Sequence, residues 1–115
     1  MPLSQGLKDA IREQSKRLRG TSLAEEMLGI RGSIVTVTLG GRLRRMVRAT
    51  YKGKPRLLEP YSLRWRNRRR PDLPLIYMVD RVSAPGQIKA FSPDRFEGPL
   101  QVTPSPYRPK WLVEL

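Results

Sequence analysis

Five arginines and one tryptophan fall within nine residues of this chain, in the stretch RWRNRRRPD at positions 64–72. The planar guanidinium of arginine carries a fork of N–H donors that matches the oxygens of a phosphate group. A tryptophan ring can stack on a nucleic-acid base, so the combination is typical of contacts to single strands. Most charge runs are only solvated surface, however, and the stretch also fits a loop that keeps the chain soluble.

The charge balance of the whole chain favours an anionic partner. The sequence holds 23 basic and 10 acidic residues, which gives a formal net charge of +13. Such an excess repels itself unless a polyanion shares it. Residues 42–70 contain twelve of the basic residues and one acid, Glu59. We therefore expect a partner that is single-stranded DNA or RNA, or a nucleotide, rather than an acidic membrane surface.

The residue types that the sequence lacks exclude several kinds of catalytic and metal-binding site. The sequence has no cysteine and no histidine, which removes disulfides, thiol nucleophiles, the usual zinc sites and imidazole acid–base catalysis. Asp72, Asp80 and Asp94 are the only candidates for a carboxylate cluster around a metal. We expect no enzyme, no cofactor and no metal, and keep a metal-dependent nuclease or other phosphoryl-transfer enzyme as the second alternative. The lack of cysteine, of a secretion signal and of a long apolar run predicts a cytoplasmic chain with no membrane partner.

The pattern of apolar residues changes from helical to alternating near Gly32. Residues 4–19 predict a helix capped by Ser4, and residues 22–29 predict a second, short helix. The β-branched run SIVTVTL at 33–39 predicts a strand, and the two glycines after it a tight turn. We therefore expect a helical segment over residues 1–32 and a small β-barrel over residues 33–115.

Short strands separated by turns make up the rest of the expected barrel. Lys52 and Gly53 predict a hairpin turn, and Pro55 and Pro60 predict a strand edge or a bend. The expected strands lie at about 45–51, 54–66, 75–80, 88–91, 100–103 and 110–115. So many short strands with turns between them are typical of a small barrel.

Four segments, YKGKPRLLEPYSL, LIYMVD, GQIKAFSPDRFEG and VTPSPYRPKWLVEL, resemble the WYL domain family in their order. The family's R-x-x-E-P-x-x-L segment is matched by Arg56, Glu59, Pro60 and Leu63, after a strand that ends in Tyr51. Its second segment is matched by Lys89, Phe91, Asp94, Arg95 and Phe96. The resemblance covers roughly residues 45–115. The tripeptide that names the family is absent, since the matching strand reads Pro74-Leu75-Ile76.

The resemblance implies a fold and a function. WYL domains are similar to Sm-like barrels, so we expect a mainly β, α+β fold: an N-terminal helix or two short helices, followed by a small five- to six-stranded Sm-like barrel. The family occurs in bacterial transcription regulators and phage-defence proteins, where a basic pocket is thought to sense nucleotides or single strands. We expect a regulatory domain that binds nucleic acid or a nucleotide. The alternative is a general RNA- or DNA-binding barrel without a regulatory ligand.

Strand alternation and the resemblance together suggest a binding face. Alternation places Arg64 and Arg66 on one face of a strand and Trp65 on the other, with Tyr61 and Leu63, so we expect Trp65 in the core. Lys89 and Arg95 come from the resemblance, and the alternative for Arg95 is a capped turn with a local ion pair at Asp94. The expected binding residues are Arg48, Arg56, Arg64, Arg66, Arg68, Arg69, Arg70, Tyr77, Lys89 and Arg95.

Two further expectations concern pairing. Glu59 is the single acid of the basic stretch, so we expect it to pair with Arg56 or a neighbouring arginine. A homo-oligomer could form by pairing along an exposed strand edge or by packing of the thin apolar stripe of the first helix against a partner helix.

Overall fold

The computed structural model describes the backbone of residues 7–115 and the side chains from residue 24 onward. One long helix leads into five strands, with a short 3-10 turn before the last strand. These elements are α1 (Leu7–Leu43), β1 (Arg45–Tyr51), β2 (Lys54–Arg64), β3 (Leu75–Asp80), β4 (Ile88–Phe91), η1 (Pro93–Arg95) and β5 (Phe96–Pro106). The sheet is antiparallel with the order β4-β3-β2-β1-β5. The expected mainly β, α+β fold with an N-terminal helix is confirmed.

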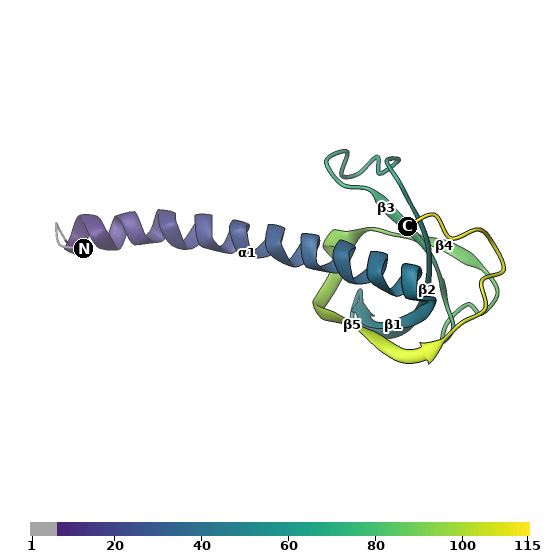
Figure 1. Ribbon diagram of the computed structural model, residues 1–115. Coiled ribbons are helices and arrows are strands. Elements are labelled where there is room, and N and C mark those ends of the chain that lie inside the picture. Colours follow the sequence, from purple (N-terminus) through teal and green to yellow (C-terminus); the bar gives the residue numbers. More distant parts are fainter. Residues whose placement is uncertain (1–6) are drawn as a thin grey trace.

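The sheet wraps around the last turns of α1 but does not close into the expected barrel (Figure 1). β4 and β5 are its edges, and no strand pairing joins them in the described part of the chain. The strand expected over residues 110–115 contributes a single parallel bridge, between Ser62 and Glu114. Three prolines at 104, 106 and 109 precede this segment, and proline has no N–H to donate to a ladder.

The strand expected over residues 33–39 is wrong, because α1 continues through it to Leu43. Ile30 and Val37 are buried and Ile34 packs against the core, a helical spacing that turns one face of α1 toward the sheet. Val35 and Leu39, from the rest of the helix surface, are exposed. Burial of this helical face outweighs the preference of β-branched residues for strands. The two short helices are thus one helix, and the expected cap at Ser4 lies outside the described residues.

Gly40 and Gly41 do not form the expected turn but lie in the last turn of α1. A Cβ atom on Gly40 would lie 2.5 Å from the side chain of Val47, and one on Gly41 would collide with Leu115. The two glycines therefore let the helix end approach β1 and the C-terminal residue closely. No helix in the described part of the chain is both long and apolar enough to cross a membrane.

Of the remaining strands, β5 differs from the expectation, because it runs over Phe96–Pro106 and not only over 100–103. The others agree closely with the sequence. β3 and β4 have the expected bounds, and the β1–β2 hairpin turns at Lys52 and Gly53. Both residues have positive φ angles, 52° and 76°, as a two-residue hairpin turn of the primed type requires. β2 bulges between Pro60 and Ser62, where proline predicts a bend.

The two faces of the sheet carry different cores. On the inner face, Leu58, Ile76 and Met78 pack against Val37 of α1. On the outer face, Tyr61 and Val79 pack with Tyr107, at the start of the C-terminal segment 107–115. The alternation along β3 therefore points Ile76 and Met78 inward and Leu75, Tyr77 and Val79 outward.

Candidate nucleic-acid interface

The arginine-rich stretch leaves β2 at Arg64 and reaches β3 as a loop, the teal loop at the top of Figure 1. Asn67, which is buried, anchors this loop. Its Nδ2 donates to Ser92 Oγ at 2.8 Å, and its Oδ1 accepts the backbone N–H of Arg70 at 3.0 Å. The loop thus has a fixed base, which is what a binding loop needs if its exposed side chains are to hold one arrangement.

Two of the three consecutive loop arginines are bound to aspartates. Arg69 donates to both carboxylate oxygens of Asp94, at 2.7 and 2.9 Å, and to Ser92. Arg70 donates to both oxygens of Asp72, at 3.1 and 2.8 Å. Burial raises the pKa of Asp94, but hydrogen bonds from Arg69 and Ser92 outweigh it and leave the pKa below its ordinary value. Asp94 is thus in an ion pair, but not in the local one expected for its turn, because its closest partner is Arg69, 25 residues earlier in the sequence.

Trp65 does not lie in the core as expected. Its side chain is 73% exposed. β2 ends at Arg64, and the backbone N–H of Arg66 donates to the Arg64 carbonyl at 3.0 Å in a tight bend. The expected alternation already breaks at the β2 bulge, since Tyr61 packs in the outer core and Leu63 against the inner one, and the strand then stops one residue before Trp65. Trp65 is absent from the binding residues expected from sequence, although the prolines and arginines that follow it indicate that the strand ends nearby.

An open concavity of about 580 Å³ lies beside Trp65. Its lining includes Trp65, Arg66, Arg68, Leu75 and Tyr77. A second, smaller hollow shares Arg66 and Tyr77 with it and extends to Ser62, Arg64 and Ile88. We call the two together the Trp65 groove. Tyr77 is half-buried and pairs across the sheet with Ser62 and Ala90, so it forms part of the groove's floor.

The arginines of the groove differ in their partners. Arg64 forms an exposed ion pair with Glu114 of the C-terminal segment. Arg66 and Arg68 are exposed, and neither has an acidic partner among the residues whose side chains are described. An aromatic ring and two unpaired guanidinium groups thus open onto one concave surface, where they can meet a base and phosphates together.

Arg56, another expected contact, lies away from the groove. Its guanidinium donates to Asp80 at 2.9 Å and lies over the ring of Tyr51, 5.6 Å from the centroid. Only 15% of its side chain is exposed. Burial raises the pKa of Asp80, but hydrogen bonds from Arg56 and the Val82 N–H outweigh it and lower the pKa overall. This arginine therefore acts as the partner of a buried carboxylate.

Three more expected residues line neither hollow of the groove. Arg48 is exposed on β1, opposite Leu57 and Gln101. Lys89 is exposed on β4 opposite Met78, an inward-facing residue, so it points away from the face of Tyr77. Arg95 is half-buried at the end of η1, beside the β1–β2 turn, where its carbonyl accepts the N–H of Lys52.

The carboxylates proposed for a metal each have an arginine partner: Asp72 pairs with Arg70, Asp80 with Arg56 and Asp94 with Arg69. Within the described residues, no group of three or more potential metal ligands converges. Glu59 pairs with an arginine, but the partner is Arg81, at 2.9 Å and 22 residues away in sequence, and not the expected Arg56 or a neighbouring arginine.

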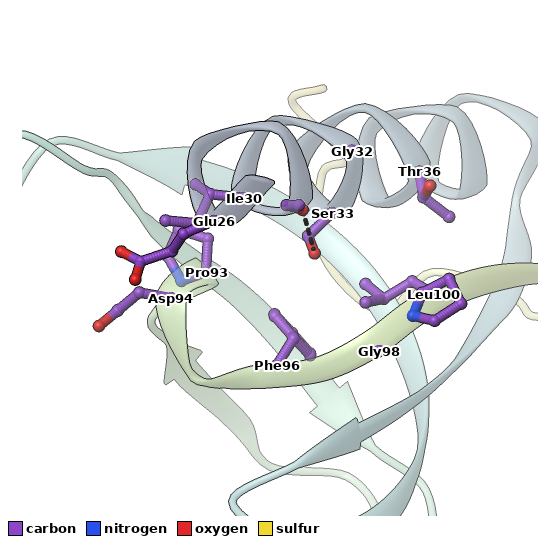
Figure 2. A pocket seen from close by; sticks show the side chains of 12 residues that line it. Glu26, Ile30, Gly32, Ser33, Thr36, Pro93, Asp94, Phe96, Gly98 and Leu100 are labelled. Atoms are coloured by element: carbon purple, nitrogen blue, oxygen red, sulfur yellow. Dashed lines mark hydrogen bonds between the residues drawn. The ribbon is translucent and has the colours of Figure 1, made fainter. Parts of the chain in front are cut away.

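A different hollow, of about 460 Å³, lies between α1 and β5. Figure 2 shows Ile30 and Ser33 of the helix facing Phe96 and Leu100 of the strand across it. The Ser33 hydroxyl donates to the helix carbonyl of Gly29 at 3.0 Å. Among the residues whose side chains are described, the charged ones in its lining are acids, Glu26 and Asp94. This surface therefore does not suit a phosphate group.

Comparison with known proteins finds no matching family model, no matching curated protein and no matching solved structure. The WYL resemblance therefore stays a prediction that rests on its motifs.

Several motif residues have structural roles. The Tyr51 ring packs edge-on against Phe91 and Phe96, with centroids 4.8 and 4.9 Å away, and its hydroxyl accepts the N–H of Ser92.

Proposed function

We propose that this protein binds single-stranded nucleic acid through the Trp65 groove. The observation that carries the proposal is the exposed ring of Trp65 beside Arg66, Arg68 and Tyr77 on one concave surface. A large exposed aromatic ring costs free energy in water unless a partner covers it, and the flat face of a base is a suitable partner.

The geometry favours a single strand over a duplex. Bases in a duplex are stacked on one another, whereas the bases of a single strand can splay out onto aromatic rings. The two hollows of the groove share Arg66 and Tyr77, which gives a continuous path from Trp65 to Ile88. We propose that Trp65 stacks on one base, Tyr77 contacts the next nucleotide, and Arg66 and Arg68 hold the phosphates.

The resemblance to WYL domains supports a regulatory role for this binding, in which the bound strand or nucleotide is the signal. A general RNA- or DNA-binding domain without regulation remains the alternative. We propose binding rather than catalysis, because the three candidate carboxylates are each engaged with an arginine. The absence of cysteine from the sequence supports a cytoplasmic location.

A direct binding assay tests the proposal. Labelled single-stranded DNA, single-stranded RNA and duplex DNA of equal length are titrated with the protein at about 50 and about 200 mM salt. We expect at least one single strand to bind more tightly than the duplex, and the affinity to fall steeply with salt as counterion release weakens. Absence of oligonucleotide binding at the lower salt concentration would overturn the proposal.

A further inference from the structure

A second basic concavity lies on the outer face of the sheet, beside the C-terminal segment. We infer that it binds a phosphate group. It has a volume of about 340 Å³, and its lining includes Glu59, Val79, Arg81, Gly86, Arg108 and Lys110. Three cations against one carboxylate leave it a formal charge of +2. We call it the Lys110 site.

The single acid of this site is occupied by protein groups. Glu59 has a buried side chain, and its two oxygens accept from the Tyr61 hydroxyl at 3.1 Å and from Arg81 at 2.9 Å. Arg81 uses one terminal nitrogen, Nη1, in this bond, while its side chain is 48% exposed. Its Nε and Nη2 have no hydrogen-bond partner among the described side chains and backbone. Glu59 therefore holds Arg81 in place and leaves donors free for a ligand.

Arg108 and Lys110 are carried on a fixed segment. The Tyr107 hydroxyl donates to the carbonyl of Pro60, and the backbone N–H of Lys110 donates to the Tyr61 hydroxyl at 3.1 Å. The next residue, Trp111, packs edge-on against the Tyr61 ring with centroids 5.3 Å apart. Neither Arg108 nor Lys110 has an acidic partner among the described side chains. Two unpaired cations on an anchored backbone suit an anion, because the segment that carries them loses little conformational entropy when the anion binds.

The opposite wall is the tight loop that follows β3. The Asp80 carboxylate accepts the N–H of Val82 at 2.9 Å, and the Asp80 carbonyl accepts the N–H of Ala84 at the same distance. The loop then turns at Gly86, whose φ of 79° favours glycine. The Lys110 ammonium lies 3.9 Å from where a Cβ atom of Gly86 would stand. The Lys110 ammonium thus lies close to this wall.

The position of the site relates it to the Trp65 groove, and this step rests on the proposed function. Leu75 and Tyr77 line the groove and Val79 lines the Lys110 site, and all three point outward from β3. Four residues of strand span about 13 Å. A strand bound at Trp65 can therefore place a backbone phosphate in the Lys110 site. A free nucleotide is the other ligand that could supply a phosphate group to the Lys110 site.

The test compares the wild-type chain with two double variants that each remove two positive charges. Arg108→Gln with Lys110→Gln alters the Lys110 site, and Arg45→Gln with Lys54→Gln is the matched control, since both side chains are exposed and line neither concavity. Pyrophosphate binding is measured by calorimetry, and binding of a trinucleotide and a dodecanucleotide by fluorescence anisotropy. Circular dichroism checks that each variant is folded.

We expect the site variant, unlike the control, to lose about tenfold in affinity for pyrophosphate, for the dodecanucleotide, or for both. Loss for the dodecanucleotide but not the trinucleotide identifies a backbone phosphate as the ligand. Loss for pyrophosphate alone identifies a free phosphate or nucleotide. The inference is overturned if the site variant and the control behave alike toward both. If no oligonucleotide binds the wild-type chain, the proposed function fails, and the pyrophosphate measurement alone decides this inference.

Discussion

Arg69 and Asp94 form an ion pair of 2.7 Å that ties the loop after β2 to the turn before β5. The aspartate is mostly buried and also binds Ser92, so the arginine is committed to structure. Arg64 and Arg70 likewise have acidic partners. Of the five arginines in residues 64–70, Arg66 and Arg68 are left without an acidic partner among the described side chains. If this run binds nucleic acid as proposed, its affinity should therefore depend on two residues rather than five.

Replacing Arg66 and Arg68 by glutamine should weaken single-strand binding by about tenfold or more at low salt. If each arginine contacts one phosphate, the slope of log affinity against log salt should fall in magnitude by about 1.4, since a single strand contributes about 0.7 per phosphate. Thermal stability should not change, because neither side chain has a protein partner among the described residues. Fluorescence anisotropy over a salt series measures both quantities.

The matched control for this variant replaces Arg69 and Arg70 by glutamine, which removes the same charge. We expect it to lower the melting temperature, because Asp94 loses its closest cation, and to weaken binding by only a few-fold, mainly at low salt, where screening is weak. A larger loss of affinity from the control than from the Arg66 and Arg68 variant would contradict the assignment.

Replacing Trp65 by alanine should weaken binding by about tenfold and leave the salt slope unchanged, since stacking contributes roughly 1–3 kcal/mol per base and releases no counterion. Trp65→Phe should restore part of the affinity. In a Trp111→Phe background, Trp65 is the single tryptophan, and its fluorescence should be quenched by a bound strand. Absence of quenching in this background at saturating strand concentration would show that the strand does not lie on Trp65.

Replacing Glu114 by glutamine should tighten binding two- to three-fold at about 50 mM salt, with no change at about 500 mM. The variant frees Arg64, which lines the groove, and removes a carboxylate that repels phosphate. Glu97→Gln on β5 is a suitable control, because Glu97 is exposed and lines neither hollow of the groove. Equal gains from both variants would mean that net charge alone, and not Arg64, is responsible.

Replacing Arg56 by alanine should lower the free energy of unfolding by about 3 kcal/mol, because Asp80 would remain buried and charged without its partner. Oligonucleotide affinity per folded molecule should stay within about two-fold of the wild type. Urea denaturation and anisotropy measure the two effects separately. A loss of affinity without a loss of stability would mean that Arg56 contacts the oligonucleotide.

Stability should fall in acid. Asp80 and Asp94 have folded-state pKa values below their ordinary value of 3.8. The folded chain then binds fewer protons than the unfolded one, so their contribution is present above about pH 4 and lost as the pH falls through the lower folded-state pKa. Asp80→Asn should be less stable than the wild type at neutral pH and lose less stability between about pH 4 and pH 2. An equal loss of stability for both proteins over this pH range would exclude Asp80 as a source of the pH dependence.

The part of the sheet with clear local signals was predictable from sequence. The apolar run LIYMVD and the turn at Lys52 and Gly53 are set by neighbouring residues, so their elements lie where the pattern places them. The excess of arginine over residues 42–70 likewise indicated a basic surface without the structure.

The tertiary structure decided the rest, because the same residue types satisfy more than one local pattern. The run at 33–39 alternates like a strand, and it became helix because Ile30, Ile34 and Val37 bury a common face against the sheet. Apart from Arg70 with Asp72, the acidic partners of the paired arginines are distant in sequence, as Asp80 is from Arg56 and Glu114 from Arg64. Charge counting therefore cannot tell a paired arginine from a free one. The exposure of Trp65 and the convergence of Arg81, Arg108 and Lys110 depend on where strands end and loops return, which only the folded chain determines.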